Sequence, residues 1–440
     1  MNTAPGFVLK SLLISSVASM TALVGACSTL PRAPAPPPAD VSAAPVGFPS
    51  QVRFVGIDPE SFDRRANAVV ETVRDAARGG AVNVLALSGG GAGGAFGAGA
   101  LVGMTRHGDR PVFHVVTGVS VGALLAPFAF LGPDWDSELL AGFADGGISK
   151  LLRLGGPAIL FRPSIYAGGP LRSFVDRLVT QRLVDAVASE AARGRLLLVA
   201  TTDLDKQETV IWDLGAVAAV GGEAARALFR DVLVASTSIP GVFPPVLIHV
   251  TDGERKYDEM HVDGATTVPF LVAPEISQLD RGHVLDLHGG RIYVLVNGAL
   301  SASPATTKAS SFAVISRGFA ASSMHGSRRT IELGSEFARR HRMDLQFSYI
   351  PTTYPYRGSL DFETDELRRL FEFGMRCGET GQLWTRLEAA VEEGRKTLAA
   401  PVPAPTCPAP TGVPNPRFAA ADAGAVAPTL AGPPWREREP

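Results

Sequence analysis

Residues 82–124 read VNVLALSGGGAGGAFGAGALVGMTRHGDRPVFHVVTGVSVGAL, and this stretch decides the fold class. Two apolar runs typical of β-strands each end in a glycine-rich turn, and each turn precedes a run typical of a helix. The first turn, Gly89–Gly94, offers backbone N–H groups. The second, Gly118-Val119-Ser120-Val121-Gly122, places a serine at a strand-to-helix corner. A serine at such a corner, close to a donor-rich loop, is the arrangement that acyl transfer needs.

Strand-like and helix-like segments alternate on both sides of this stretch. We expect strands at 82–87, 112–117, 196–202, 209–213 and 291–297, and helices near 95–106, 120–130, 171–179 and 223–235. Residues 246–250 and 257–262 flank Asp252-Gly253 and resemble a hairpin. From Ala299 onward the pattern is mainly helical, with a long helix near 365–397. Several strands are continuous apolar runs, as in a sheet covered on both faces. The sequence therefore predicts a three-layer α/β/α fold with a central, mainly parallel sheet.

Both ends of the chain differ in composition from this middle part. Residues 1–26 combine Lys10, an apolar run and small residues before Cys27, which is typical of a signal peptide. The sequence Leu23-Val24-Gly25-Ala26-Cys27 resembles the lipobox of bacterial lipoproteins, which predicts a lipidated Cys27 at the mature N-terminus. Of the 34 prolines, 7 lie in residues 31–50 and 11 in residues 401–440. We expect residues 27–50 to be an extended linker and residues 401–440 a disordered tail.

Overall composition excludes several functional classes. The 440 residues are 46% hydrophobic and carry a formal net charge of −2, which gives no sign of a nucleic-acid partner. No cluster of cysteines and histidines has the spacing of metal ligands, so we expect neither a metal nor another cofactor. Cys377 and Cys407 could pair in an oxidising compartment. Because Cys407 lies in the proline-rich tail, we expect these two cysteines not to be bridged.

The glycine loop has a competing interpretation. Gly89, Gly91 and Gly94 satisfy the dinucleotide fingerprint GxGxxG between a strand and a helix. That fingerprint requires an acid at the end of the second strand, to bind a ribose hydroxyl. Here the second strand ends at Thr117 without a carboxylate, which argues against a dinucleotide. We expect Gly97 and Gly99 to serve only helix packing.

A serine nucleophile needs a base to take its proton. His249, His261, His283 and His288 follow Ser120 in an order compatible with a Ser-His-Asp triad, but none lies in a recognisable catalytic turn. Asp263 is the better candidate. It ends a predicted strand and precedes Gly264, so a tight turn can direct its carboxylate across the edge of the sheet. A plain Asp-Gly turn without any catalytic role remains an alternative.

Four blocks in this order resemble the patatin-like lipid acyl hydrolases. They are Gly89-Gly90-Gly91, Gly118-Val119-Ser120-Val121-Gly122, Ala235-Ser236-Thr237-Ser238-Ile239-Pro240 with Phe243-Pro244-Pro245, and Asp263-Gly264-Ala265. The resemblance implies a patatin-like hydrolase domain over residues 51–400, with a motif-bearing core at 82–298 and a helical part at 299–400. It implies Ser120 as nucleophile, Asp263 as base and Gly89, Gly90 and Gly91 as the oxyanion hole, with Gly118, Gly122, Gly264 and Pro240 supporting the motifs.

One position departs from the family pattern. The family often has arginine or lysine two residues after the third glycine, where this chain has Gly93. We therefore expect hydrolysis of lipid or phospholipid esters, with an open question about the headgroup. Two alternatives remain, an α/β-hydrolase esterase with a histidine base and a non-catalytic lipid-binding lipoprotein. With Ser28 after Cys27, the expected location is the bacterial envelope, anchored to the outer membrane and facing the periplasm.

Overall fold

The computed structural model describes residues 32–37, 43–55, 70–144, 147–149, 164, 166–272, 287–301, 306–387 and 405–409. The predicted signal peptide, Cys27 and the tail beyond residue 409 lie outside the described residues, as does His283. Among the helices of the described part, none is both long enough and apolar enough to cross a bilayer.

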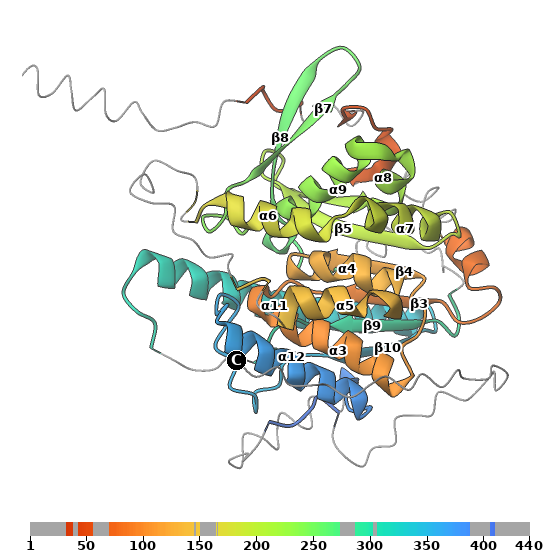
Figure 1. Ribbon diagram of the computed structural model, residues 1–440, viewed down its shortest axis with the longest axis vertical. Coiled ribbons are helices and arrows are strands. Elements are labelled where there is room, and N and C mark those ends of the chain that lie inside the picture. Colours follow the sequence, from red (N-terminus) through yellow and green to blue (C-terminus); the bar gives the residue numbers. More distant parts are fainter. Residues whose placement is uncertain are drawn as a thin grey trace, which may run out of the picture.

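Five parallel strands form one half of a ten-stranded sheet, in the order β5-β4-β3-β9-β10 (Figure 1). They are β3 (Asn83–Leu87), β4 (Val115–Val119), β5 (Leu196–Asp203), β9 (Arg291–Leu295) and β10 (Asp344–Ser348). Leu87 of β3 pairs with Gly118 of β4. Because these strands are parallel and in register, the two glycine-rich turns that follow them meet at the same edge of the sheet.

The other half of the sheet is antiparallel. Here β5 pairs with β6 (Glu208–Asp213) and with β8 (Lys256–Asp263), and β8 pairs in turn with β7 (Val246–Thr251). The predicted hairpin at 246–262 is thus confirmed, and Figure 1 shows it rising from the sheet. Two short strands complete this half, β1 (Ala44–Pro45) against β7 and β2 (Arg53–Val55) against β6.

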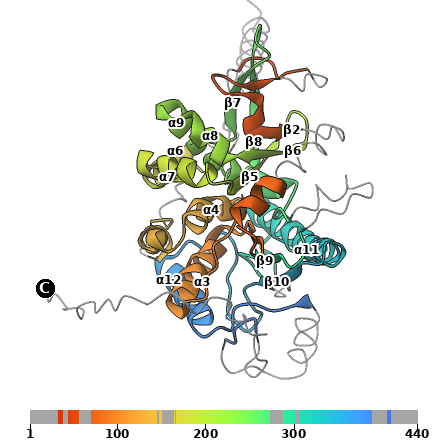
Figure 2. The same ribbon diagram turned by 90° about the vertical axis from the view of Figure 1, so that its right-hand side faces the viewer.

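Helices cover both faces of the sheet, which confirms the three-layer α/β/α prediction. Most of them lie on one face, and α11 (Ser311–Arg340) lies on the other (Figure 2). The larger group comprises α3 (Gly94–His107), α4 (Val121–Leu131), α5 (Asp136–Leu139), α6 (Gly168–Leu178), α7 (Gln181–Ala191), α8 (Leu214–Val220), α9 (Gly222–Ser236) and α12 (Thr364–Glu379).

Successive side chains of β9 point alternately into two hydrophobic cores, one on each face of the sheet. Tyr293 and Leu295 are buried in the core on the side of α3 and α12. Ile292 and Val294 point the other way, into a second core with α11. A strand that is buried on both faces has a continuous apolar sequence, and this pattern led to the prediction of a strand at 291–297.

Glycines bring α3 and α12 into close contact. A Cβ on Gly99 would lie 2.0 Å from the carbonyl oxygen of Phe371, and one on Gly374 would lie 2.2 Å from that of Phe96. A Cβ on Gly97 would lie 2.2 Å from Oδ1 of Asn297. The packing role predicted for Gly97 and Gly99 is therefore confirmed.

One expectation about the elements was wrong, the extent of the helix at 365–397, and several elements were not predicted. The part after Ala299 contains a parallel strand, β10, beside the predicted helices. The long helix expected at 365–397 ends at Glu379, where α12 terminates, and its remainder beyond residue 387 lies outside the described residues. Helices α7, of 11 residues, and α8, of 7 residues, were not predicted.

The expected linker at 27–50 packs against the domain wherever the structure describes it. Arg32 forms a bidentate ion pair with Asp205, and the N–H of Ala33 donates to the Asp258 carboxylate over 2.7 Å. Strand β1 pairs with the β7 edge. Proline-rich composition predicts an extended backbone, and that extended backbone here lies on the sheet instead of spanning solvent.

The prediction against a Cys377–Cys407 bridge was also wrong. The two cysteines form a disulfide, with Cα atoms 5.5 Å apart. Cys377 is fully buried in α12, and residues 405–409 return to this helix end, where the N–H of Ala409 donates to the carbonyl of Gln382 over 2.9 Å. Proline density excludes helix and strand, but it does not prevent a short segment from docking through a covalent bond.

Candidate active site

Ser120 occupies the sharp corner between β4 and α4. Its backbone has φ 56° and ψ −127°, a conformation that a non-glycine residue adopts only when its surroundings enforce it. The neighbouring glycines make this corner sterically feasible. A Cβ on Gly118 would lie 2.6 Å from the carbonyl oxygen of Gly122, and one on Gly122 would lie 2.3 Å from that of Leu87. The supporting role predicted for both glycines fits this geometry.

Strand β5 brings the serine and the aspartate together. Val119, the last residue of β4, pairs with Ala200 of β5, and Asp263, the last residue of β8, pairs with Thr201. The ends of β4 and β8 are therefore adjacent along one strand. Ser120 follows directly, and its Oγ donates to Oδ2 of Asp263 over 2.6 Å.

A tight turn fixes the Asp263 carboxylate. Its second oxygen, Oδ1, accepts the N–H of Ala265 over 2.8 Å. A Cβ on Gly264 would lie 2.5 Å from the carbonyl oxygen of Ala200, so the turn requires glycine at this position. The Asp-Gly turn thus holds the carboxylate against the serine hydroxyl. A plain turn without a catalytic role would not need this contact.

The environment of Asp263 is dry. The residue is 0% exposed and Ser120 is 5% exposed. Burial raises the pKa of Asp263 to about 7, although the hydrogen bonds from Ser120 and the Ala265 N–H oppose this rise. A carboxylate with a pKa near neutrality is a far stronger base toward a hydroxyl than an exposed one, whose pKa is about 4.

The glycine loop provides two donors, not three. The N–H of Gly89 donates to the carbonyl oxygen of Pro269 over 3.1 Å, so this predicted member of the oxyanion hole is already engaged. In the described part of the chain, no acceptor pairs with the N–H of Gly90 or Gly91. Both have positive φ, 156° and 55°, which turns the loop toward the cavity that Ser120 lines. These two N–H groups are suited to bind an oxyanion.

Gly93, where the family often has a cation, has no room for a side chain. A Cβ at this position would lie 2.0 Å from the carbonyl oxygen of Asn297 and 3.0 Å from the Tyr356 hydroxyl. The Tyr356 hydroxyl also donates to the carbonyl of Gly90 over 3.3 Å. A side chain at position 93 would therefore require the loop or its neighbours to shift.

Two residues that sequence reasoning missed hold this arrangement in place. The side chain of Ser236 accepts the N–H of Ser120 over 3.0 Å and donates to the carbonyl of Ala200 over 2.8 Å. Asn297 donates through Nδ2 to the carbonyl of Ser88 over 2.7 Å and so joins the end of β9 to the glycine loop. Ser236 lies in the quoted Ala235–Pro240 block, which was a signal for it. No motif marks Asn297.

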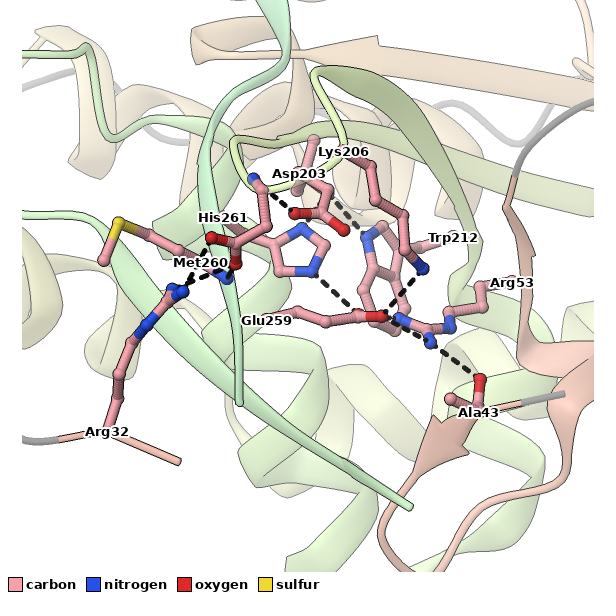
Figure 3. A network of polar contacts seen from close by, with 11 residues as sticks. Arg32, Ala43, Arg53, Asp203, Lys206, Trp212, Glu259, Met260 and His261 are labelled. Atoms are coloured by element: carbon pink, nitrogen blue, oxygen red, sulfur yellow. Dashed lines mark hydrogen bonds and ion pairs between the residues drawn. The ribbon is translucent and has the colours of Figure 1, made fainter. Parts of the chain in front are cut away.

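Among the described residues, no histidine forms a hydrogen bond with Ser120. Figure 3 shows His261 within a buried polar network, where Nδ1 lies 2.9 Å from Thr201 Oγ1 and Nε2 lies 3.3 Å from Glu259. His249 pairs with Asp258 on the hairpin, at 2.5 Å. His288 lies beside Val82, at the opposite end of β3 from the glycine loop. Among the described residues, Asp263 is the base within reach.

The network around His261 centres on Glu259. Arg53 of β2 forms a buried ion pair with Glu259, and Lys206 lies 3.5 Å from it (Figure 3). Burial disfavours the ionised form of Glu259, but His261 and Arg53 outweigh it and lower the pKa to about 2. Trp212 donates to Thr201 over 2.8 Å and completes the contacts between β6, β5 and β8.

Ser120 opens into a cavity of about 260 Å³. The loop glycines, Ile239, Ala265 and the first half of α11 form its walls. Pro240, one of the predicted supporting residues, lines a neighbouring cavity. In the described residues, no group of three or more His, Cys, Asp or Glu side chains is arranged to hold a metal ion.

The residues of this site lie in a region that matches a known protein family. Residues 85–274 match the family model of the patatin-like phospholipases, and this region belongs to that family. All four sequence blocks and the Ser120–Asp263 pair lie within the matched residues. A search of curated proteins found no match.

Two solved structures resemble the chain at low identity. One is VipD from Legionella pneumophila, at 14% identity and a TM-score of 0.36, with 68% of this chain and 67% of that chain covered. The other is the human GIVD cytosolic phospholipase A2, at 13% identity and a TM-score of 0.30, with 59% of this chain covered. The match spans about half of the human protein, 49% of its length.

Proposed function

We propose that this protein is a serine hydrolase that cleaves carboxylic ester bonds of lipids through a Ser120–Asp263 dyad and an acyl-enzyme. Membership of residues 85–274 in the patatin-like phospholipases supports a lipid ester hydrolase at the level of the family. The observation that carries the dyad is the 2.6 Å hydrogen bond from the Ser120 hydroxyl to a fully buried carboxylate.

In the first half-reaction, Ser120 Oγ attacks the ester carbonyl carbon while Asp263 takes its proton. The N–H groups of Gly90 and Gly91 bind the oxyanion of the tetrahedral intermediate. Collapse of the intermediate breaks the bond to the alcohol, which leaves with the proton from Asp263. In the second half-reaction, water attacks the acyl-enzyme, again with Asp263 as base, and the fatty acid leaves.

The dyad is tested with short-chain p-nitrophenyl esters and a fluorophosphonate probe. The wild-type protein should turn over the esters and be labelled at Ser120. Ser120→Ala and Asp263→Asn should each lose turnover while remaining folded by circular dichroism. Retained activity in the aspartate variant would point to a histidine base, and absence of both turnover and labelling in the wild type would favour a lipid-binding protein without catalysis.

We also propose that the protein is a lipoprotein of the bacterial envelope, anchored through Cys27 to the outer membrane and facing the periplasm. The Cys377–Cys407 disulfide supports an oxidising compartment, because such bonds persist there and are rare in the cytosol. Mass spectrometry of the N-terminus of the membrane-bound protein tests this location. An unmodified N-terminus upstream or downstream of Cys27 would contradict it.

A further inference from the structure

The cleft at Ser120 consists of two cavities that share a wall. The first, of about 260 Å³, holds Ser120 and the glycine loop. The second, of about 420 Å³, lies beside it without contact to Ser120. Four residues line both cavities: Ile239, Ala265, Phe319 and Ser359. An ester bound at Ser120 therefore has two separate spaces for the two groups that diverge from its carbonyl.

Helix α11 forms part of both cavities. Ser316, Gly318 and Ser322 face the second cavity, whereas Arg317 and Met324 face the first. Phe319 lies between the two, and its half-buried ring packs against the core on the side of α4. Residues of α11 line both cavities, so the division of the cleft depends on this helix, which lies on the opposite face of the sheet from α3 and α4 (Figure 2).

The two cavities differ in charge. Arg317 and Arg357 line the first cavity, and no carboxylate is among its lining residues. Among the described residues that line the second cavity, none is charged. Arg357 is held at the wall by Asp361 and Glu366, at 3.2 Å and 3.7 Å, and its side chain is 63% exposed. A guanidinium carries five N–H donors in a planar fork, so it can bind a phosphate oxygen beside such partners.

We propose that the acyl chain of the substrate occupies the second cavity, and that a phosphate on the alcohol lies beside Arg317 and Arg357 in the first. The chain avoids the cavity in which it would desolvate two guanidinium groups. The phosphate gains charge-assisted hydrogen bonds there. This inference rests on the proposed ester hydrolysis. It assigns the residues that select the acyl chain and the phosphate of the substrate.

A pair of glycines allows each cavity to be filled in turn. A Cβ on Gly318 in the second cavity, or on Gly298 in the first, would meet no heavy atom within 4 Å. Leucine therefore fits the space at both positions. Gly169, on α6 outside both cavities, is equally open and provides the control variant Gly169→Leu.

The acyl assignment is tested by the ratio of kcat/KM for p-nitrophenyl palmitate to that for p-nitrophenyl butyrate. Gly318→Leu should lower this ratio by roughly tenfold or more, since the lost space accommodates several methylenes of the longer chain. Gly298→Leu should lower kcat/KM for both esters by the same factor, and Gly169→Leu should change neither. A ratio lowered by Gly298→Leu instead would place the chain in the first cavity and overturn the proposal.

The phosphate assignment is tested with monopalmitoylglycerol and its phosphate ester, which share acyl chain and glycerol. Arg317→Gln and Arg357→Gln should each lower the preference for the phosphorylated substrate by about tenfold. Arg368→Gln, on the exposed face of α12, is the control. An unchanged preference in both variants would refute the role of the arginines. Failure of the wild type to cleave any of these esters would instead refute the proposed hydrolysis itself.

Discussion

Strand β8 carries two fully buried carboxylates whose surroundings are opposite. Glu259 lies within an ion-paired network with Arg53, Lys206 and His261, and its pKa falls to about 2. Within the described part of the chain, the carboxylate of Asp263, four residues further on, bonds with the Ser120 hydroxyl and one backbone N–H alone, and its pKa rises to about 7. The comparison shows that burial alone does not decide the state of a carboxylate. The cations around Glu259 keep it ionised, whereas burial without a described cation partner raises the pKa of Asp263 into the range suited to the base that we propose.

Asp263→Asn should cause the largest change in activity. An amide keeps the shape of the carboxyl but cannot take the serine proton, so kcat should fall by about 10²–10⁴-fold. The variant should remain folded, which near-ultraviolet circular dichroism checks. A kcat within tenfold of the wild type would show that another group serves as the base.

Glu259→Gln, the matched change on the same strand, should act on stability instead. It leaves the buried Arg53 guanidinium without its counter-charge, which should lower the free energy of unfolding by about 3–5 kcal/mol. Urea denaturation measures the loss. The double variant Arg53→Met/Glu259→Met should recover most of it, because a buried pair replaced by apolar side chains is often neutral. If Glu259→Gln were as stable as the wild type, the Arg53–Glu259 ion pair would not stabilise the fold.

Asp263→Asn should at the same time stabilise the fold in a pH-dependent way. The folded pKa of Asp263 lies above its unfolded value, so the wild type loses stability as the pH rises from about 4 to about 7. Asp263→Asn does not lose this stability, because the amide does not ionise. The free energy of unfolding of the variant should equal that of the wild type at pH 4 and exceed it by up to about 4 kcal/mol at pH 8. Equal melting curves at pH 8 would contradict a carboxylate held in a dry site.

Reduction of the Cys377–Cys407 bridge should have the smallest effect. The bridge closes a separation of 30 residues, and Cys377→Ala/Cys407→Ala should lower the free energy of unfolding by about 2–4 kcal/mol. Ser120 lies near the N-terminal end of α3, where Gly94 packs on Val121, whereas Gly378 beside Cys377 packs on Gly103 near the other end of α3. We therefore expect kcat to stay within twofold. A large loss of kcat would show that the docked segment supports the site.

The sequence allowed prediction of the fold class, and it singled out Ser120 and Asp263, which the structure brings into hydrogen-bond contact, because both predictions depend on local signals. Apolar strands, the glycine corner around Ser120 and the Asp263-Gly264 turn are each contiguous in the chain. The oxyanion donors were predicted less well, because only the structure shows that Pro269 engages the N–H of Gly89.

Contacts between distant segments could not be predicted in the same way. The Asn297 clamp, the Arg53–Glu259 pair and the Cys377–Cys407 bridge each join residues far apart in sequence. Composition indicated flexible ends, and it carries no information about a salt bridge such as Arg32–Asp205. Strand β10 was missed because its five residues, Asp344–Ser348, follow a long helical pattern and include polar side chains.

The pH dependence of kcat/KM tests the contrast between the two carboxylates most directly. With p-nitrophenyl butyrate, which does not titrate, the rate reports the free enzyme. Asp263 must be ionised to accept the serine proton, so kcat/KM should fall tenfold per unit as the pH drops below about 7. A plateau that extends down to about pH 4, as for an exposed carboxylate, would contradict the account.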